Sequence, residues 1–172
     1  MSSLEKYCLD ANVLIEAWQK YYSPKFFPEY WDMLNDLGNR DRIFLPGVVA
    51  DEIFKTDDGL SNWLRQSKIP IQPISEAITA ALTSIYATHA DHKFLVDNTR
   101  QRSLADPWVI AHAMACKACV VTKENLETAV NSKRIKIPNV CENMGVRWIN
   151  DFQLIGELKL KFSLSTLDFG QV

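Results

Sequence analysis

The chain has 172 residues, of which 47% are hydrophobic and 23% are charged, and its formal net charge is −2. This size and composition are typical of one globular domain with its own core and exclude a disordered chain, while the charge gives no bulk sign of nucleic-acid binding. No apolar run approaches the roughly 20 residues of a membrane span, and residues 1–18 lack the pattern of a signal peptide, so we expect a cytoplasmic protein.

In the first half of the chain, short strands alternate with amphipathic helices. Short β-branched or aromatic runs predict strands, and apolar residues three and four positions apart predict helices. The expected elements are, in order, a strand at residues 6–9, helices at 13–18 and 28–38, a strand at 43–46, helices at 48–54 and 60–64, an extended segment at 69–74, and a helix from 77 to about 90.

The second half begins with a polar stretch without a clear pattern, residues 91–103. Asp106-Pro107 then predicts a helix N-cap followed by proline at the first helical position. The remaining expected elements are a buried strand at 119–122, a helical stretch at 126–130, a turn at 131–134, strands at 135–138 and 146–149, and a last helix that Asp151 caps and that ends near 158.

This order of elements predicts a three-layer α/β/α domain with a mainly parallel central sheet. Helices that connect parallel strands must cover both faces of the sheet, because each connection crosses from one strand to the next over a face. We expect residues 1–158 to form a single domain and residues 159–172 to form a tail.

Four acids fall near a predicted strand end or at the start of the following helix: Asp10, Glu52, Asp106 and Glu124. In a parallel sheet these positions converge on one edge. Carboxylates held together raise one another's pKa unless a cation neutralises them, and Mg²⁺ or Mn²⁺ prefers such oxygen ligands. Taken singly, an acid like Asp106 is more often just a helix N-cap, and one like Glu52 is more often a solvated helix residue. Glu124 has polar neighbours, Asn125 and Glu127, that could serve nearly as well.

The four acids lie in short motifs: DANVLI from residue 10, VVADEI from 48, ADPWVIA from 105, and VVT from 120, with Glu124 two residues after it. In order and spacing these motifs resemble the PIN-domain nucleases. The segment IPNVC from residue 137, with GV from 145, resembles a small, toxin-related PIN-like subgroup. The resemblance covers nearly the whole chain.

The resemblance implies a ribonuclease that depends on Mg²⁺ or Mn²⁺, hydrolyses RNA phosphodiester bonds and leaves a 5′-phosphate. It assigns Asp10, Glu52, Asp106 and Glu124 as catalytic metal ligands, although the fourth acid of the family is usually Asp in a Thr-x-Asp arrangement. It also implies the toxin of a toxin–antitoxin pair, with a cognate antitoxin as partner, and many such proteins form homodimers.

Three polar residues are expected to contact the RNA substrate. Asn12 matches a polar position beside the first acid, and Lys123 and Arg134 are basic residues that bracket the acid-bearing stretch, although a scattered solvated surface explains each basic residue equally well. Further basic candidates are Arg100, Arg102, Lys133 and Lys136. The alternative function is a non-catalytic PIN-like module whose acidic pocket binds an arginine of a protein partner.

Overall fold

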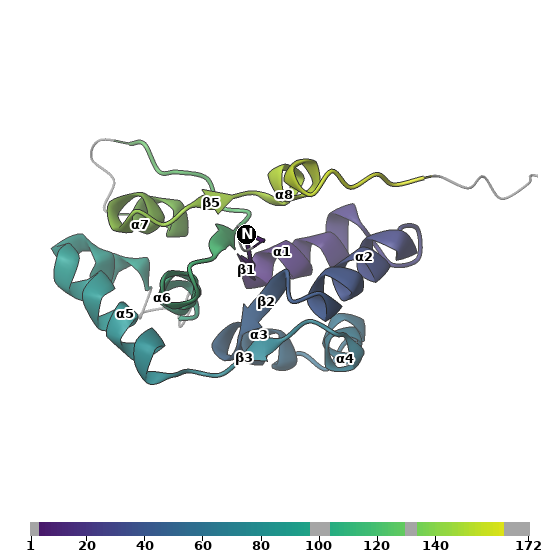
Figure 1. Cartoon of the computed structure of the whole chain (residues 1–172), viewed down its shortest axis with the longest axis horizontal. Coiled ribbons are helices and arrows are strands. Elements are labelled where there is room, and N and C mark those ends of the chain that lie inside the picture. The colour runs from purple at the N-terminus through teal and green to yellow at the C-terminus, as the bar shows by residue number, and fades with distance from the viewer. Residues whose placement is uncertain (1–3, 97–103, 130–133, 164–172) are drawn as a thin grey trace, which may run out of the picture.

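A five-stranded, entirely parallel sheet forms the centre of the protein (Figure 1). The computed structural model describes residues 4–96, 104–129 and 134–163. The strands, in the spatial order β3-β2-β1-β4-β5, are β3 (Ile71–Gln72), β2 (Ile43–Pro46), β1 (Tyr7–Leu9), β4 (Cys119–Val121) and β5 (Trp148–Ile149). The predicted three-layer α/β/α fold with a parallel sheet is confirmed.

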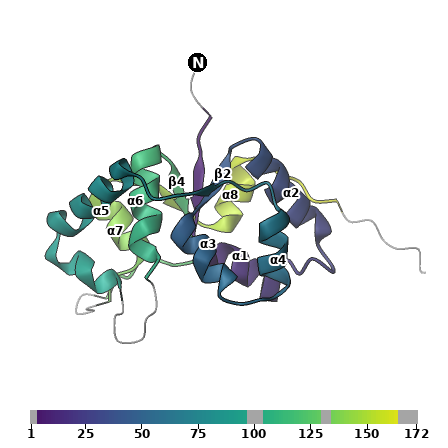
Figure 2. The same cartoon turned by 90° about the horizontal axis from the view of Figure 1, so that it is seen from below.

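Helices cover both faces of this sheet (Figures 1 and 2). One layer contains α1 (Ala11–Glu16) with its π-helical continuation η1 (Ala17–Tyr21), α2 (Pro28–Asn39), α3 (Gly47–Phe54), α4 (Gly59–Gln66) and α8 (Asp151–Glu157). The other contains α5 (Glu76–Thr88), the 3₁₀ segment η2 (Ala90–Leu95), α6 (Asp106–Cys116) and α7 (Ile137–Met144). None of the helices in the described part of the chain combines the length and apolarity needed to cross a lipid bilayer.

The three central strands are buried on both faces, which explains why their sequences are continuously apolar rather than alternating. Leu9, Phe44 and Val120 are completely buried. In the register of β1 and β4, Leu9 lies opposite Val121. The next residue of each strand therefore leaves the sheet at the same level, at the carboxyl edge.

The segment at residues 135–138, predicted as a strand, is not one, because a helix begins inside it. Lys136 is the N-cap of α7 and Pro138 lies in its first turn, where a missing N–H costs no intrahelical hydrogen bond. The side chain of Asn139 accepts the N–H of Lys136 at 3.3 Å. Proline at this place opens a helix instead of ending a strand.

The helix predicted at residues 126–130 is also absent, from Leu126 to Ala129; Val130 lies outside the described residues. The Asn139 side chain replaces the helical hydrogen bonds there. Its Oδ1 accepts the N–H of Glu127 at 3.1 Å, and its Nδ2 donates to the carbonyl of Glu127 at 3.0 Å. A long-range amide contact of this kind has no signature in local apolar spacing.

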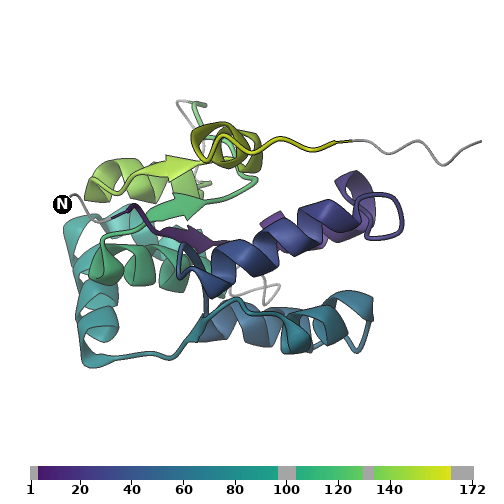
Figure 3. The ribbon, with the colours of Figure 1, turned by 45° about the vertical axis from the view of Figure 1, so that its right-hand side comes forward.

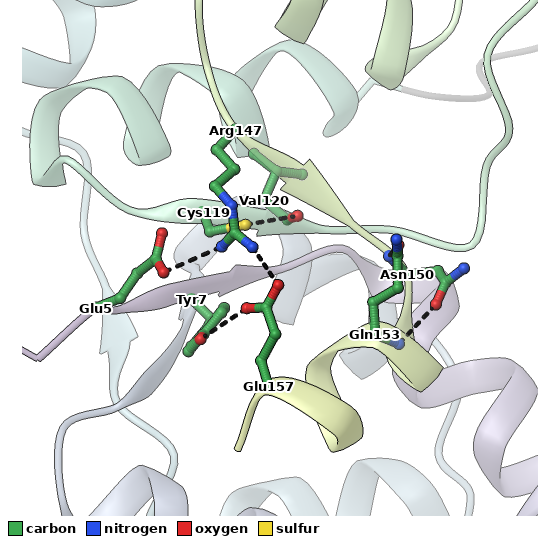
Figure 4. A network of polar contacts seen from close by, with 8 residues as sticks. All are labelled: Glu5, Tyr7, Cys119, Val120, Arg147, Asn150, Gln153 and Glu157. Atoms are coloured by element: carbon green, nitrogen blue, oxygen red, sulfur yellow. Dashed lines mark hydrogen bonds and ion pairs between the residues drawn. The ribbon is translucent and has the colours of Figure 1, made fainter. Parts of the chain in front are cut away.

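A polar network ties α8 to the amino edge of the sheet (Figure 4). Arg147, just before β5, forms ion pairs with Glu157 at the end of α8 and with Glu5, the latter at 3.0 Å. The hydroxyl of Tyr7 donates to Glu157 at 3.1 Å. Because α8 starts just after β5 and ends at this network, it spans the sheet from the carboxyl edge to the amino edge.

Candidate metal site

Asp10 follows β1 directly and stands at the N-cap position of α1 with extended backbone angles, φ −78° and ψ 150°. Its N–H donates to the carbonyl of Val121 at 3.0 Å, and its own carbonyl accepts the N–H of Val13 at 3.1 Å. Only 3% of the residue is exposed. The strand and the helix together fix a nearly buried carboxylate at the carboxyl edge of the sheet.

The Thr122 hydroxyl connects this carboxylate to the next loop. Oγ1 of Thr122 donates to Oδ2 of Asp10 at 3.0 Å and accepts the N–H of Glu124 at 3.1 Å. The Glu124 carboxylate in turn accepts the N–H of Ile137, the first residue of α7, at 2.8 Å. Thr122 thus holds the backbone of Glu124, and the first residue of α7 holds its carboxylate. The positive end of the α7 dipole faces the negative charge of Glu124.

The surroundings of Asp10 raise its pKa from 3.8 to about 7. Burial is the main cause, because it penalises the charged form, and the negative charges of Glu124 and Glu52 act in the same direction. The hydrogen bonds from Thr122 and from the N–H of Ala11 act against this rise and lower the pKa. At neutral pH the site therefore favours binding either a proton or another cation.

The other two predicted acids, Glu52 and Asp106, lie on two different helices. Glu52 is an exposed residue of α3, close enough for its charge to raise the pKa of Asp10. Asp106 is the first residue of α6 and is 9% exposed. Because α6 leads into the amino end of β4, the start of α6 lies at the carboxyl edge. The predicted capping role of Asp106 is wrong, since Ala105 holds the N-cap position and Pro107 is the second helical residue.

The oxygen donors at this edge suit a hard divalent cation, although they do not form a closed shell. In residues 4–96, 104–129 and 134–163, no three His, Cys, Asp or Glu side chains gather closely enough to surround a metal ion. Mg²⁺, however, keeps several waters and commonly binds through one or two carboxylates. A buried carboxylate with a raised pKa, near a second carboxylate, provides the negative charge that such an ion neutralises.

An ion pair adjoins the acids. The ammonium of Lys123 lies 3.0 and 3.1 Å from the two carboxylate oxygens of Asp151, whose side chain is 4% exposed. Asp151 does not cap α8 as predicted, because Asn150 does so by accepting the N–H of Gln153 at 2.9 Å. The sequence did carry a signal for Asp151: it follows β5 closely, much as Asp10 follows β1.

Residues 7–162 match the family described as "Domain of unknown function (DUF4411)". The chain belongs to this family. No curated protein matches its sequence.

Several solved structures resemble this DUF4411 chain, and two of them follow. The first is described as VapBC2 from Rickettsia felis bound to a DNA fragment from their promoter; the identity is 17%, the TM-score is 0.54, and the match covers 84% of this chain and 97% of the other. The second is FitAcB from Neisseria gonorrhoeae, with 16% identity, a TM-score of 0.52, and 85% and 98% of the two chains covered. At these identities the likeness shows the fold alone, which is PIN-like as the motifs indicated.

The expected substrate-binding residues of this DUF4411 chain lie in different surroundings. Asn12 is exposed in the first turn of α1, two residues from Asp10. Lys123 is largely enclosed by its pairing with Asp151, at 15% exposure of its side chain. Arg134 is exposed and lines a cavity of about 600 Å³ with Phe94. Three of the further basic candidates, Arg100, Arg102 and Lys133, lie outside the described residues.

Proposed function

We propose that the chain is a Mg²⁺- or Mn²⁺-dependent endoribonuclease that hydrolyses RNA phosphodiester bonds, and that it is the toxin of a toxin–antitoxin pair. One observation carries the proposal. A carboxylate at a strand's carboxyl end, 3% exposed and with its pKa raised to about 7, lies within electrostatic range of Glu52 and Glu124. A buried carboxylate charge is costly unless a cation and hydrogen bonds offset it, so its presence at this edge favours a bound cation.

In this proposal the metal ion would be held, directly or through water, by Asp10, Glu52 and Asp106. Glu124 would be the fourth acidic ligand. A Mg²⁺ or Mn²⁺ ion held by these residues would lower the pKa of a bound water and would offset the negative charge of the phosphodiester. Thr122 fixes the orientation of the Asp10 carboxylate, because it donates a hydrogen bond to Oδ2. The water oxygen bonds to phosphorus, the 3′-oxygen leaves with a proton, and the product carries a 5′-phosphate.

The toxin role rests on the family resemblance and on the two structural relatives. The VapBC2 structure is described as bound to a DNA fragment from their promoter. We propose a cognate antitoxin protein as partner of this chain, and a homodimer as its assembly. Expression of the chain alone should arrest growth, and the Asp10→Asn variant should not.

Cleavage of RNA by the purified protein tests the catalytic proposal. Wild type should cut single-stranded RNA in the presence of Mg²⁺ or Mn²⁺ and lose this activity in excess EDTA. Asp10→Asn and Asp106→Asn should be inactive. Asp36→Asn is the matched control, because its exposed carboxylate on α2 only pairs with Arg40 one turn away. Equal cleavage by wild type and by both site variants would refute the proposal.

The second candidate function is a non-catalytic binding module that uses the acidic edge to bind an arginine of a protein partner. The observation that favours it is the engagement of Glu124 by the Ile137 N–H, in an edge that lacks a closed metal shell among the described residues. Calorimetric titration with Mn²⁺ separates the two functions. Binding that Asp10→Asn removes supports the nuclease, and no binding supports the module.

A further inference from the structure

Two exposed aromatic rings, those of Tyr21 and Phe152, lie around the ammonium of Lys123, which neighbours Glu124 in the chain. Tyr21 is the last residue of η1 and is 47% exposed, and Phe152 is the second residue of α8 and is 60% exposed. Both rings flank one cation: the Lys123 ammonium lies 4.4 Å from the centre of the Tyr21 ring and 5.5 Å from that of Phe152. In Figures 1 and 3, α8 lies above the helix that begins with α1.

The position of Lys123 places these rings next to the acids. Lys123 stands between Thr122, which donates to Asp10, and Glu124, whose charge raises the pKa of Asp10. Tyr21 also ends the helix that starts just after Asp10, and at 1.5 Å per residue this helix is at most about 16 Å long. A nucleic-acid strand with one phosphate at Asp10 would therefore carry neighbouring nucleotides past the rings.

The charges at this place favour a neutral, flat ligand over a phosphate. The ammonium of Lys123 is already neutralised by Asp151, which contacts it through both carboxylate oxygens. A phosphate here would meet the charges of Asp151 and Glu124. A nucleobase is uncharged at neutral pH, and any base can stack on an aromatic ring because every base has a π-face.

We propose that Tyr21 and Phe152 form a stacking platform for one or two bases of the RNA strand that enters the metal site. The platform rests on the proposed nuclease function and names the part of the substrate that the site recognises. Lys123 and Asp151 act as positioning residues: their ion pair fixes the cation that both rings contact. The platform holds an unstacked, single-stranded segment, because bases within a duplex do not offer their faces.

Binding of a short, labelled, single-stranded RNA to the uncleaving Asp10→Asn protein tests the platform. Adding Tyr21→Ala or Phe152→Ala should weaken binding by about 5- to 150-fold, the range that base–aromatic stacking spans. Tyr21→Phe and Phe152→Tyr should retain it. Tyr86→Ala is the matched control, since Tyr86 is 40% exposed and lies on α5, in the other helix layer, and it should leave binding unchanged.

A second measurement separates stacking from a change in folding. RNAs with one abasic nucleotide, moved along the strand, should bind the Asp10→Asn protein weakly at one or two positions. The Tyr21→Ala and Phe152→Ala proteins should show no further loss at those positions, because the stacking partner is already gone. A further loss equal to that of the background protein would overturn the platform.

The failure of the platform differs from the failure of the nuclease proposal. If wild type cuts RNA but the alanine variants bind RNA as tightly as the background, the platform is wrong and the rings are available to a protein partner. If wild type neither cuts nor binds RNA, both proposals fall together.

Discussion

The Thr122 hydroxyl donates a hydrogen bond of 3.0 Å to Oδ2 of Asp10, although 112 residues separate them in the chain. The contact follows from the register of the sheet, in which Leu9 lies opposite Val121, so that the next residue of each strand leaves the sheet at the same level. A parallel pair of buried strands thus delivers a carboxylate and a hydroxyl to one point.

Replacement of Thr122 by valine should destabilise the protein. Valine keeps the shape but leaves the buried Asp10 oxygen and the N–H of Glu124 without their partner, which costs about 1–3 kcal/mol of unfolding free energy. Thr122→Ser keeps the hydroxyl and should lose less. Urea unfolding measures both variants, and equal stability of the valine and serine proteins would show that the hydroxyl has no such role.

The raised pKa of Asp10 predicts a dependence of stability on pH. Between 3.8, its ordinary value, and about 7, the folded chain keeps a proton that the unfolded chain has lost. The contribution of Asp10 to stability is therefore present below this window and is lost as the pH rises through it.

Asp10→Asn cannot ionise and should escape this loss. Without metal, its unfolding free energy should match that of wild type near pH 4 and exceed it above pH 7, by at most about 4 kcal/mol at 1.36 kcal/mol per pKa unit. Added Mn²⁺ should raise the melting temperature of wild type alone. Melting curves from pH 4 to 8 measure the effect, and a constant difference across this range would contradict it.

Removal of one member of the buried Lys123–Asp151 ion pair should lower the free energy of unfolding. Asp151→Ala leaves a lysine that is 15% exposed without its carboxylate, at a cost of about 3 kcal/mol. The double variant Lys123→Met/Asp151→Leu should be more stable than Asp151→Ala, because no buried charge is left unpaired. Urea unfolding of Asp151→Ala and of the double variant forms the test, and a double variant no more stable than Asp151→Ala would contradict the cost of the unpaired lysine.

Replacement by alanine should have opposite effects on stability at Gly38 and at Gly156. A Cβ on Gly38 would lie 2.7 Å from Cα of Ile69, so Gly38→Ala must displace backbone and should cost more than about 1 kcal/mol. Gly156 lies inside α8 with nothing within 4 Å of its Cβ position, so Gly156→Ala should stabilise by about 0.5–1 kcal/mol. Thermal unfolding compares them, and a stabilised Gly38→Ala protein would contradict the packing of α2 on residue 69.

Sequence patterns predicted the fold class because the three central strands are continuously apolar, and because apolar residues three and four positions apart mark the helices that separate them. They also placed Asp10 directly after a buried strand, where the structure has it, because a polar residue at that point stands out in the sequence. They failed where long-range contacts decide local structure. Asn139 holds Glu127 and so prevents the helix expected there, and Pro138 opens α7 within a segment whose β-like residues predicted a strand.

The side-chain partners of the acids could not be predicted from the sequence, although their positions near strand ends could. Only the structure shows that Glu124 is bound by the N–H of Ile137 and that Asp151 pairs with Lys123, because both contacts join segments whose spacing in the chain is arbitrary. The convergence of Tyr21 and Phe152 on one ammonium is of the same kind. Side-chain partners across a sheet edge follow from the tertiary fold, not from local pattern.

The central claim is that the acids at the carboxyl edge hold a divalent ion. Anomalous diffraction from a crystal of the wild-type protein soaked in Mn²⁺ tests it most directly. The account predicts one or two peaks at this edge, with a carboxylate oxygen of Asp10 among the ligands and with Glu52, Asp106 or Glu124 beside it, and no peak there in Asp10→Asn. Absence of a peak at Asp10 at a saturating concentration of Mn²⁺ would contradict the account.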